Sequence, residues 1–304
     1  MLIKADNARE TLPAWIEAHY DELQQALVEH GGILFRGYPV TSAAAFQDCI
    51  RSFRDHGLDY MYRSTPRTRI ARGVFTATEY PARLEIPLHN ENAYQREWPL
   101  RVAFCCLQPS IEGGETPLAD MRSVTRALPD TVVDAFERRG VRYIRHYHPD
   151  VDLSWQEVFQ SHSQVEVSRF CEARGIECEW LDGLLRTMQS SQGTAIHPTT
   201  GERLFFNQAH LFHASSLGND VAQAMVDAFG EDRLPRDACH ADGNDFAIGA
   251  LDTVREALRR ESITFSWQSG DVLLLDNMQI AHGRRPYRGE RTILTAMMTP
   301  HRGA

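Results

Sequence analysis

The stretch GDVLLLDNMQIAHGRRPYRGERTIL, residues 270–294, alternates between strand-like runs and turns. Residues 272–275 form a short apolar run, and RTILTAMM at 291–298 forms another. With ITFSW at 263–267, these segments predict three closing strands separated by turns. His282 follows the first of the two apolar runs and precedes a turn that contains Pro and Gly, so we expect it at the end of a strand.

Helices and strands do not alternate strictly along the rest of the chain. Helical spacing predicts helices over residues 13–28, 128–140 and 252–262, and Thr41 is a candidate cap for a helix that ends at Arg54. Strands are predicted over 33–35 and 99–107. This order predicts a mainly β fold with helical decorations, built on an antiparallel double-sheet (jelly-roll) core. No repeat or long linker interrupts residues 1–304, which predicts a single domain.

The composition places limits on function. The 304 residues are 42% hydrophobic and 24% charged, with a net charge of −9, as in ordinary globular proteins. An acidic surface argues against nonspecific binding to nucleic acid. Residues 1–20 lack a signal-peptide pattern, and no apolar run is long enough for a membrane span. We therefore expect a cytoplasmic protein with neither nucleic acid nor membrane as a partner.

A histidine and a carboxylate stand two residues apart in PLHNENAYQREWP, residues 87–99. His89 and Glu91 point to the same side of an extended backbone and supply two-thirds of a 2-His-1-carboxylate metal site. His282 is the candidate third ligand. Two other pairs compete as metal ligands, His146 with His148 and His210 with His213, but neither has a carboxylate partner.

A candidate anion clamp follows His282. Arg291 opens the last predicted strand and shares a face with Ile293, Thr295 and Met297. A facial triad leaves three metal positions open, and a bidentate 2-oxo acid fills two of them. Its far carboxylate then needs a cation, for which the planar fork of an arginine is suited. Thr116, in GGET at 113–116, is a candidate hydroxyl beside it. Alternatively, Arg291 forms a surface salt bridge and Thr116 is a turn residue.

The combination of HNE with three longer segments resembles the taurine catabolism dioxygenase (TauD/TfdA-like) family, most closely its SyrP-like branch. The segments are WPLRVAFCCLQPSIEGGETPLADMR (98–122), FFNQAHLFH (205–213) and DNMQIAHGRRPYRGERTIL (276–294). The resemblance implies a double-stranded β-helix core and dependence on Fe(II), 2-oxoglutarate and O2. It also implies that His89, Glu91 and His282 bind the iron, and that Arg291 and Thr116 hold 2-oxoglutarate.

Two positions depart from the family pattern. Many members have Asp where this chain has Glu91, a variant seen in amino-acid hydroxylases that resemble clavaminate synthase. A carboxylate there argues against a halogenase. Taurine-type members carry an arginine four residues after the oxoglutarate arginine, where this chain has Thr295. A sulfonate substrate is therefore not expected.

The expected reaction is hydroxylation of an unactivated C–H bond of an amino-acid-like substrate, free or tethered to a carrier protein. Desaturation, epoxidation and cyclisation stay open. Candidate substrate contacts are Asn92, Asn207 and Arg284, each of which has a turn or cap role as its alternative. The alternative function is a metal-binding jelly roll without redox chemistry, such as an isomerase or a binding protein. A zinc deaminase or a His-Glu-x-x-His hydrolase is excluded because its motif is missing.

Overall fold

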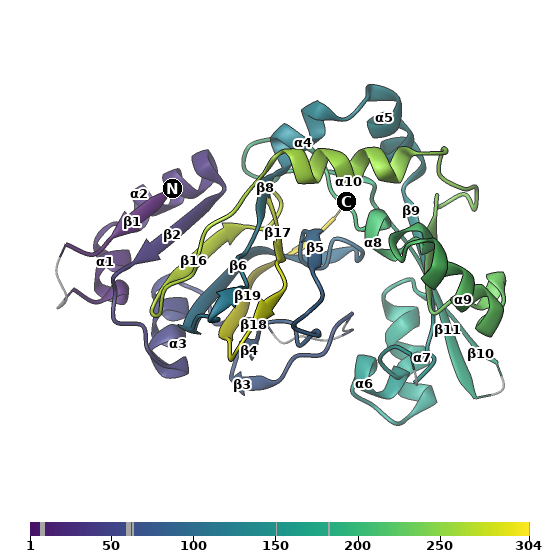
Figure 1. Cartoon of the computed structure of the whole chain (residues 1–304), viewed down its shortest axis with the longest axis horizontal. Helices are drawn as coiled ribbons and strands as arrows, with labels where there is room; N and C mark the ends of the chain where they lie inside the picture. Colours follow the sequence, from purple (N-terminus) through teal and green to yellow (C-terminus); the bar gives the residue numbers. More distant parts are fainter. Residues whose placement is uncertain (7–9, 59–61, 63, 150, 182, 304) are drawn as a thin grey trace.

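The computed structural model describes the chain except residues 7–9, 59–61, 63, 150, 182 and 304. Two β-sheets pack against each other at its centre (Figure 1). The larger sheet has the strand order β1 (Leu2–Lys4), β2 (Gly32–Arg36), β16 (Val272–Asp276), β6 (Glu97–Gln108), β19 (Thr292–Arg302), β4 (Val74–Thr76) and β3 (Arg69–Ala71). The smaller sheet has the order β15 (Ser262–Ile263), β8 (Leu118–Asp120), β17 (Ile280–Arg284) and β5 (Ile86–His89).

The larger sheet buries both of its faces, and β19 illustrates how. Leu294, Ala296 and Met298 pack with three helices on the outer face, α1 (Leu12–Ala18), α2 (Tyr20–His30) and α3 (Ala43–Ser52). Ile293 points the opposite way and packs against the smaller sheet. Side chains alternate between the faces of a strand, so a strand that is covered on both sides is apolar throughout. This explains why β19 is almost entirely apolar from Ile293 to Met298, with Thr295 as the exception.

The layer between the two sheets is apolar. Phe104 and Leu273 from the larger sheet pack there with Ile280 and the partly buried Leu118 from the smaller one. His282 reaches the same layer, and its ring centroid lies 5.0 Å from that of Phe104. The metal-ligand candidate on β17 therefore points into the interior between the sheets.

A second lobe is built from the segment between β8 and β15 (Figure 1). Its sheet has the order β10 (Glu177–Leu181), β11 (Leu184–Ser191), β9 (Val141–His146) and β14 (Arg236–Cys239), and β12 (Thr194–Ile196) pairs with β13 (Arg203–Phe205). Its helices are α4 (Met121–Ala127), α5 (Asp130–Arg139), α6 (Trp155–Phe159), α7 (Gln164–Ala173), α8 (Ala209–Phe212), α9 (Asn219–Phe229) and α10 (Ala250–Arg260), with short 3-10 turns at Ala214–Ser216 and Glu231–Arg233. A small ladder of β7 (Glu112–Gly113) and β18 (Tyr287–Arg288) lies outside this lobe.

The expectation of a mainly β chain is wrong in its proportions, although the jelly-roll core is present. Helix and strand hold comparable numbers of residues, because the long segment between β8 and β15 is largely helical. The fold is therefore mixed. Within the described residues, no helix is both long and apolar enough to cross a membrane.

Several local expectations also change. The helix expected over 13–28 is broken at His19, whose φ of −119° and ψ of 26° end α1 and begin α2. Ser42, rather than Thr41, caps α3 by accepting a hydrogen bond from the Ala45 amide. A strand was expected over ITFSW, residues 263–267, but the strand found there, β15, covers only Ser262–Ile263. His282 lies in the middle of β17 instead of at a strand end.

The pairing of β17 with its two neighbours fixes the candidate ligands. His282 is the register partner of His89 on β5 and of Leu118 on β8. A register shift by one residue would turn His282 to the other face of the sheet. The ladder therefore determines that the two histidines meet.

Asn277, in the turn between β16 and β17, holds the backbone around Glu91. Its Oδ1 accepts a hydrogen bond from the Glu91 amide at 2.7 Å. Its Nδ2 donates to the carbonyls of Glu91 at 2.9 Å and Pro99 at 2.8 Å. The side chain is fully buried. One amide thus satisfies three main-chain groups that no water reaches.

His210, on α8, supports the strand that carries His89. Its Nε2 lies 2.9 Å from the Leu88 carbonyl, so this nitrogen carries the proton and donates it. Nδ1 is buried and has no hydrogen-bond partner in the described structure. Burial lowers the pKa of His210 to about 4, so the ring is neutral at pH 7.

Replacing Asn277 by alanine should destabilise the metal-free protein by about 2–5 kcal/mol, because three buried main-chain groups lose their partner. Urea denaturation of Asn277→Ala measures this cost. Asn244 is exposed and serves as the matched control, since Asn244→Ala should change stability by less than about 0.5 kcal/mol. Equal effects of the two substitutions would contradict the role given to Asn277.

The His210 pKa also predicts a pH dependence. Its folded-state value of about 4 lies below the ordinary value of 6.5, so the unfolded chain binds the proton more readily. The contribution is complete above pH 6.5 and is lost as the pH falls towards 4, by about 3 kcal/mol in total. In urea denaturation from pH 7 to 5, His210→Gln should lose less stability than the wild type. Parallel losses would contradict the assignment.

Candidate metal centre

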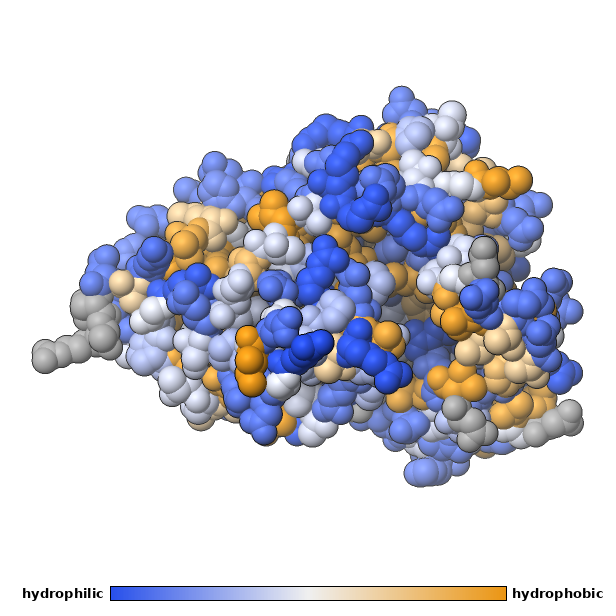
Figure 2. Space-filling view, in the orientation of Figure 1, coloured by the Kyte–Doolittle hydropathy of each residue, from blue (hydrophilic) through white to orange (hydrophobic). Residues whose placement is uncertain are grey.

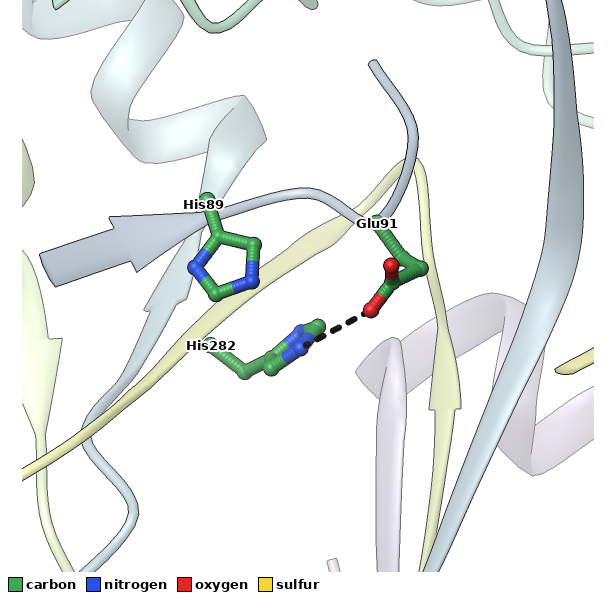
Figure 3. Close-up of side chains that lie close together, drawn as sticks. All are labelled: His89, Glu91 and His282. Carbon is green, nitrogen blue, oxygen red and sulfur yellow. Dashed lines mark ion pairs between the residues drawn. The ribbon is translucent and has the colours of Figure 1, made fainter. Parts of the chain in front are cut away.

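His89, Glu91 and His282 converge on one point (Figure 3). His89 ends β5, Glu91 lies in the turn that follows, and His282 is on β17. One ligand atom from each residue lies within 4.8 Å of the others. Glu91 Oε2 is 4.0 Å from His282 Nε2. In the part of the chain that the structure describes, this is the one cluster of His, Cys, Asp or Glu that could hold a metal ion.

The two imidazoles are prepared to act as ligands. Burial lowers the pKa of His89, and it lowers that of His282 well below the ordinary range, so both rings are neutral at pH 7. His89 Nδ1 donates to the Pro87 carbonyl at 2.8 Å, which leaves the lone pair on Nε2. His282 Nδ1 is buried without a hydrogen-bond partner in the described structure. Two neutral imidazoles and a carboxylate fit a divalent iron with open positions.

The competing histidine pairs have other partners. His146 and His148 bond the carbonyls of Leu234 and Arg233, at 2.9 and 3.1 Å. His210 bonds Leu88, and His213 bonds the Ser215 hydroxyl at 2.8 Å. These contacts serve the second lobe and its attachment to the core. Neither pair belongs to the metal cluster.

The sequence analysis missed a buried cation at the centre. Arg67 Nη2 donates to Glu91 Oε2 at 2.6 Å, and the two side chains are 3% and 4% exposed. Arg67 lies in PRTRI, residues 66–70, where the other four residues are exposed. A polar run of this kind is typical of a surface loop, so the sequence carries no signal for its burial.

Arg291 and Thr116 flank the loop that precedes β8. Arg291 donates from Nε and Nη2 to the Gly114 carbonyl, at 3.3 and 3.1 Å. Thr116 Oγ1 accepts a hydrogen bond from the Trp267 indole at 3.0 Å. Thr116 precedes Leu118, the register partner of His282, by two residues. The β8–β17 ladder thus connects Thr116 to His282, and Arg291 contacts the same loop through the Gly114 carbonyl.

The Arg291 guanidinium is a largely buried cation. Burial, with repulsion from Arg284, lowers its pKa to about 10, so it keeps its charge at pH 7. Within the described residues no carboxylate forms an ion pair with it. An anionic ligand would supply the missing counter-charge.

The two glycines of GGET allow this close approach. Gly113 and Gly114 have φ of +70° and +74°, in the left-handed region that favours glycine. A Cβ on Gly113 would lie 2.2 Å from the Pro286 carbonyl oxygen, and one on Gly114 would lie 3.0 Å from Arg291 Nε. The glycine pair therefore lets the loop pack directly against Arg291.

Asn92 lines a groove beside the cluster. Its backbone is left-handed with φ of +57°, and its buried Oδ1 has no hydrogen-bond partner in the described residues. The groove has a volume of about 430 Å³ and lies between the end of β19 and α7, with Tyr62, Trp98 and Phe170 among its lining. Figure 2 shows the surface hollowed between the body of the two sheets and the lobe that carries α6 and α7. A substrate contact by Asn92 stays a prediction.

Asn207 and Arg284 serve the main chain. Asn207 Nδ2 donates to the Gly193 carbonyl at 2.7 Å, and Oδ1 accepts from the Ala209 amide at 3.0 Å. Arg284 donates to the carbonyls of Tyr80, Pro81 and Leu84, at 2.9, 2.8 and 2.7 Å. These bonds give both side chains a structural role, and substrate contacts by them also stay predictions.

Comparison with known proteins places this geometry in a family. Residues 3–298 match the taurine catabolism dioxygenase TauD, TfdA family. The dapdiamide synthesis protein DdaC of Enterobacter agglomerans is 38% identical over 300 residues, which cover 98% of this chain and 91% of that protein. A clavaminate synthase-like protein of Arabidopsis thaliana is 31% identical over 296 residues, which cover 92% of this chain and 84% of that protein.

Solved structures share the fold at low sequence identity. PvcB of Pseudomonas aeruginosa has a TM-score of 0.57 at 15% identity, over 98% of this chain and 84% of that one. An asparagine oxygenase has a TM-score of 0.58 at 13% identity, over 94% of this chain and 79% of that one. The family match, the relatives and the triad agree. The chain therefore belongs to the TauD, TfdA family and is an Fe(II)- and 2-oxoglutarate-dependent dioxygenase.

Proposed function

We propose that the protein, acting as one oxygenase domain over residues 1–304, hydroxylates an unactivated C–H bond of an amino acid or an amino-acid-derived small molecule. His89, Glu91 and His282 hold Fe(II). Arg291 and Thr116 hold 2-oxoglutarate, and O2 is the second cosubstrate. When bound, the metal with 2-oxoglutarate and O2 supplies the oxidising chemistry that a protein side chain lacks.

The observation that carries the proposal is the convergence of two neutral imidazoles and one carboxylate, with ligand atoms within 4.8 Å, inside an apolar layer. A facial set of three ligands leaves the opposite positions open for a chelating cosubstrate and a gas. The apolar walls of Phe104 and Ile280 exclude water from that side.

Arg291 and Thr116 have separate tasks in this arrangement. The Arg291 guanidinium, which has no carboxylate partner in the described structure, binds the far carboxylate of 2-oxoglutarate. The Thr116 hydroxyl oxygen accepts a hydrogen bond from the Trp267 indole N–H. Its hydroxyl proton stays available for donation to the carboxylate of 2-oxoglutarate. The anchor fixes the cosubstrate along the β8–β17 ladder, next to His282.

The substrate class is inferred from relatives. One relative is named for dapdiamide synthesis and another as clavaminate synthase-like. A fold relative was solved with 3-hydroxyasparagine and succinate. These names support an amino-acid-like substrate in natural-product or amino-acid metabolism. A free or carrier-tethered form of that substrate and a place in the SyrP-like branch are part of the proposal and rest on the sequence resemblance. The alternative of a jelly roll without redox chemistry is not favoured, because the chain belongs to a dioxygenase family.

Succinate release is the experiment that tests the proposal. Purified protein with Fe(II), 2-oxoglutarate and O2 should release succinate above background with at least one member of a panel of free and carrier-tethered amino acids. His282→Ala should abolish that release, because the two ligands that remain, His89 and Glu91, do not hold the iron tightly enough for turnover. Asn244→Ala, an exposed substitution, is the control for handling of the protein.

Succinate without any dependence on a panel member would contradict an amino-acid substrate. Release that persists in His282→Ala would contradict the assignment of the metal site. Hydroxylated product, identified by a mass increase of one oxygen atom, separates hydroxylation from desaturation or cyclisation.

Removing the oxoglutarate clamp should have a narrower effect. Arg291→Gln should raise the KM for 2-oxoglutarate about 10- to 100-fold, because a charge-assisted bidentate contact is lost, while Fe(II) affinity is unchanged. Arg288→Gln is the matched control: Arg288 lies three residues away with its side chain 84% exposed. Equal KM values in the two variants would contradict the role of Arg291.

A further inference from the structure

Two polar groups in the walls of the groove beside the metal ligands lack hydrogen-bond partners. Asn92 Oδ1 is one of them, and the indole nitrogen Nε1 of Trp98 is the other; both atoms are buried and unpaired within the described residues. Trp98 is 3% exposed, and both residues line the groove. Buried polar groups are nearly always paired, because an unpaired donor or acceptor costs free energy of folding. A ligand in the groove would supply the partners that the chain does not.

The surroundings of Trp98 fix its ring and leave the N–H unbonded. A Cβ on Gly303 would lie 2.8 Å from Cη2 and 3.0 Å from Cζ3 of the indole, so the main chain covers the benzene end of the ring. Phe206 and His301 pack around it, with ring centroids 4.9 and 5.2 Å from that of Trp98. Nε1 belongs to the opposite, pyrrole end of the indole. The donor is therefore held in place by packing alone.

The groove lies next to the carboxylate ligand of the metal centre. Asn92 directly follows Glu91 in the chain. Met297, another residue of the groove wall, has its Sδ 3.9 Å from Nη1 of Arg67, whose guanidinium bonds Glu91. The volume of about 430 Å³ is in the range of pockets that hold small molecules. A ligand in the groove would therefore lie beside the side chains that surround Glu91.

The charged side chains of the groove interact with the chain itself. Arg302 pairs with Glu97 at 3.9 Å, and Cζ of Arg174 lies 3.9 Å from the centroid of the Phe170 ring. The two groups that lack partners are both neutral, one an acceptor and the other a donor. Burying a charge against neutral groups costs more than burying a polar group that forms hydrogen bonds. A neutral ligand with one donor and one acceptor therefore fits the groove.

We propose that the groove binds a secondary amide of the primary substrate, an inference that rests on the proposed function. The amide N–H donates to Asn92 Oδ1, and the amide oxygen accepts from Trp98 Nε1. A secondary amide is planar and carries its donor and its acceptor on opposite edges, so one group satisfies both walls. The amide belongs either to the substrate itself, as in an N-acylated amino acid, or to the pantetheine arm of a carrier protein.

Binding without turnover tests this inference. Isothermal titration is carried out anaerobically on protein loaded with Fe(II) and 2-oxoglutarate. The probes are N-acetyl-L-amino acids, each paired with the O-acetyl ester of the corresponding 2-hydroxy acid, in which an oxygen replaces the amide N–H. Pantetheine, which contains two secondary amides, is a further probe.

The variants remove one hydrogen-bonding group each. Asn92 has φ of +57°, which glycine adopts readily, so Asn92→Gly removes the acceptor and keeps the backbone conformation. Trp98→Phe keeps an aromatic ring and removes the N–H. The matched controls are Asn244→Gly at an exposed site and Trp15→Phe in the helical layer on the outer face of the larger sheet.

The wild type should bind at least one N-acetyl amino acid about 3- to 10-fold more tightly than its ester, as expected for one neutral hydrogen bond. Asn92→Gly should bring that ratio close to one. Trp98→Phe should weaken amide and ester alike, by about 3- to 10-fold, because both keep the carbonyl acceptor. The two controls should match the wild type, and the Kd of 2-oxoglutarate should stay the same in every variant.

Pantetheine shows where the amide comes from. Pantetheine that binds the wild type, and binds Asn92→Gly more weakly, would assign the amide to the arm of a carrier protein. N-acetyl amino acids that bind as expected, without binding of pantetheine, would assign the amide to the substrate itself.

Two results would overturn the inference. One is that no amide probe binds Asn92→Gly more weakly than it binds the wild type. The other is that every N-acetyl amino acid that binds the wild type binds no more tightly than its ester. Failure of the proposed function looks different, because the wild type would then bind neither Fe(II) nor 2-oxoglutarate.

Discussion

The site depends on the pairing of β17 with β5, which places His282 directly opposite His89. The third ligand, Glu91, lies beyond the end of β5 and has no ladder to hold it. Asn277 replaces the ladder there, since its side chain bonds both the N–H and the C=O of Glu91. Asn277 stands in the turn that begins β17, so the strand that carries His282 also positions the carboxylate. One ligand, His282, and the support of a second, Glu91, therefore come from one short segment.

The interior near the metal site holds buried cations, although the chain as a whole is acidic. The protein carries a net charge of −9, yet Arg67 is buried beside the neutral imidazole of His282, and Arg291 is a largely buried cation as well. Glu91 forms an ion pair with Arg67 in this region, and in the described structure no carboxylate pairs with Arg291. A dication alone would add to this positive charge. The buried and unpaired charge of Arg291 fits the binding of a doubly negative cosubstrate.

Much of the site could be predicted from the sequence, because its ligands are signalled by spacing and residue type. His89, Glu91 and His282 come together as expected, and apolar runs located β6, β16 and β19. The strand β17 was missed because IAHGR has a glycine and two polar residues and no alternation. The burial of Arg67 could not be predicted, because the polar composition of PRTRI is typical of an exposed loop. Its position depends on contacts with residues far along the chain, such as Met297.

Anaerobic titration of the metal-free protein with Fe(II) and 2-oxoglutarate tests the central claim most directly. A chelating 2-oxo acid on Fe(II) gives a weak charge-transfer band in the visible range. The account predicts that this band appears in the wild type, saturates at one Fe(II) per chain and is absent from His282→Ala. A wild-type protein that is folded and gives no band, or a band of equal strength in His282→Ala, would contradict the metal centre described above.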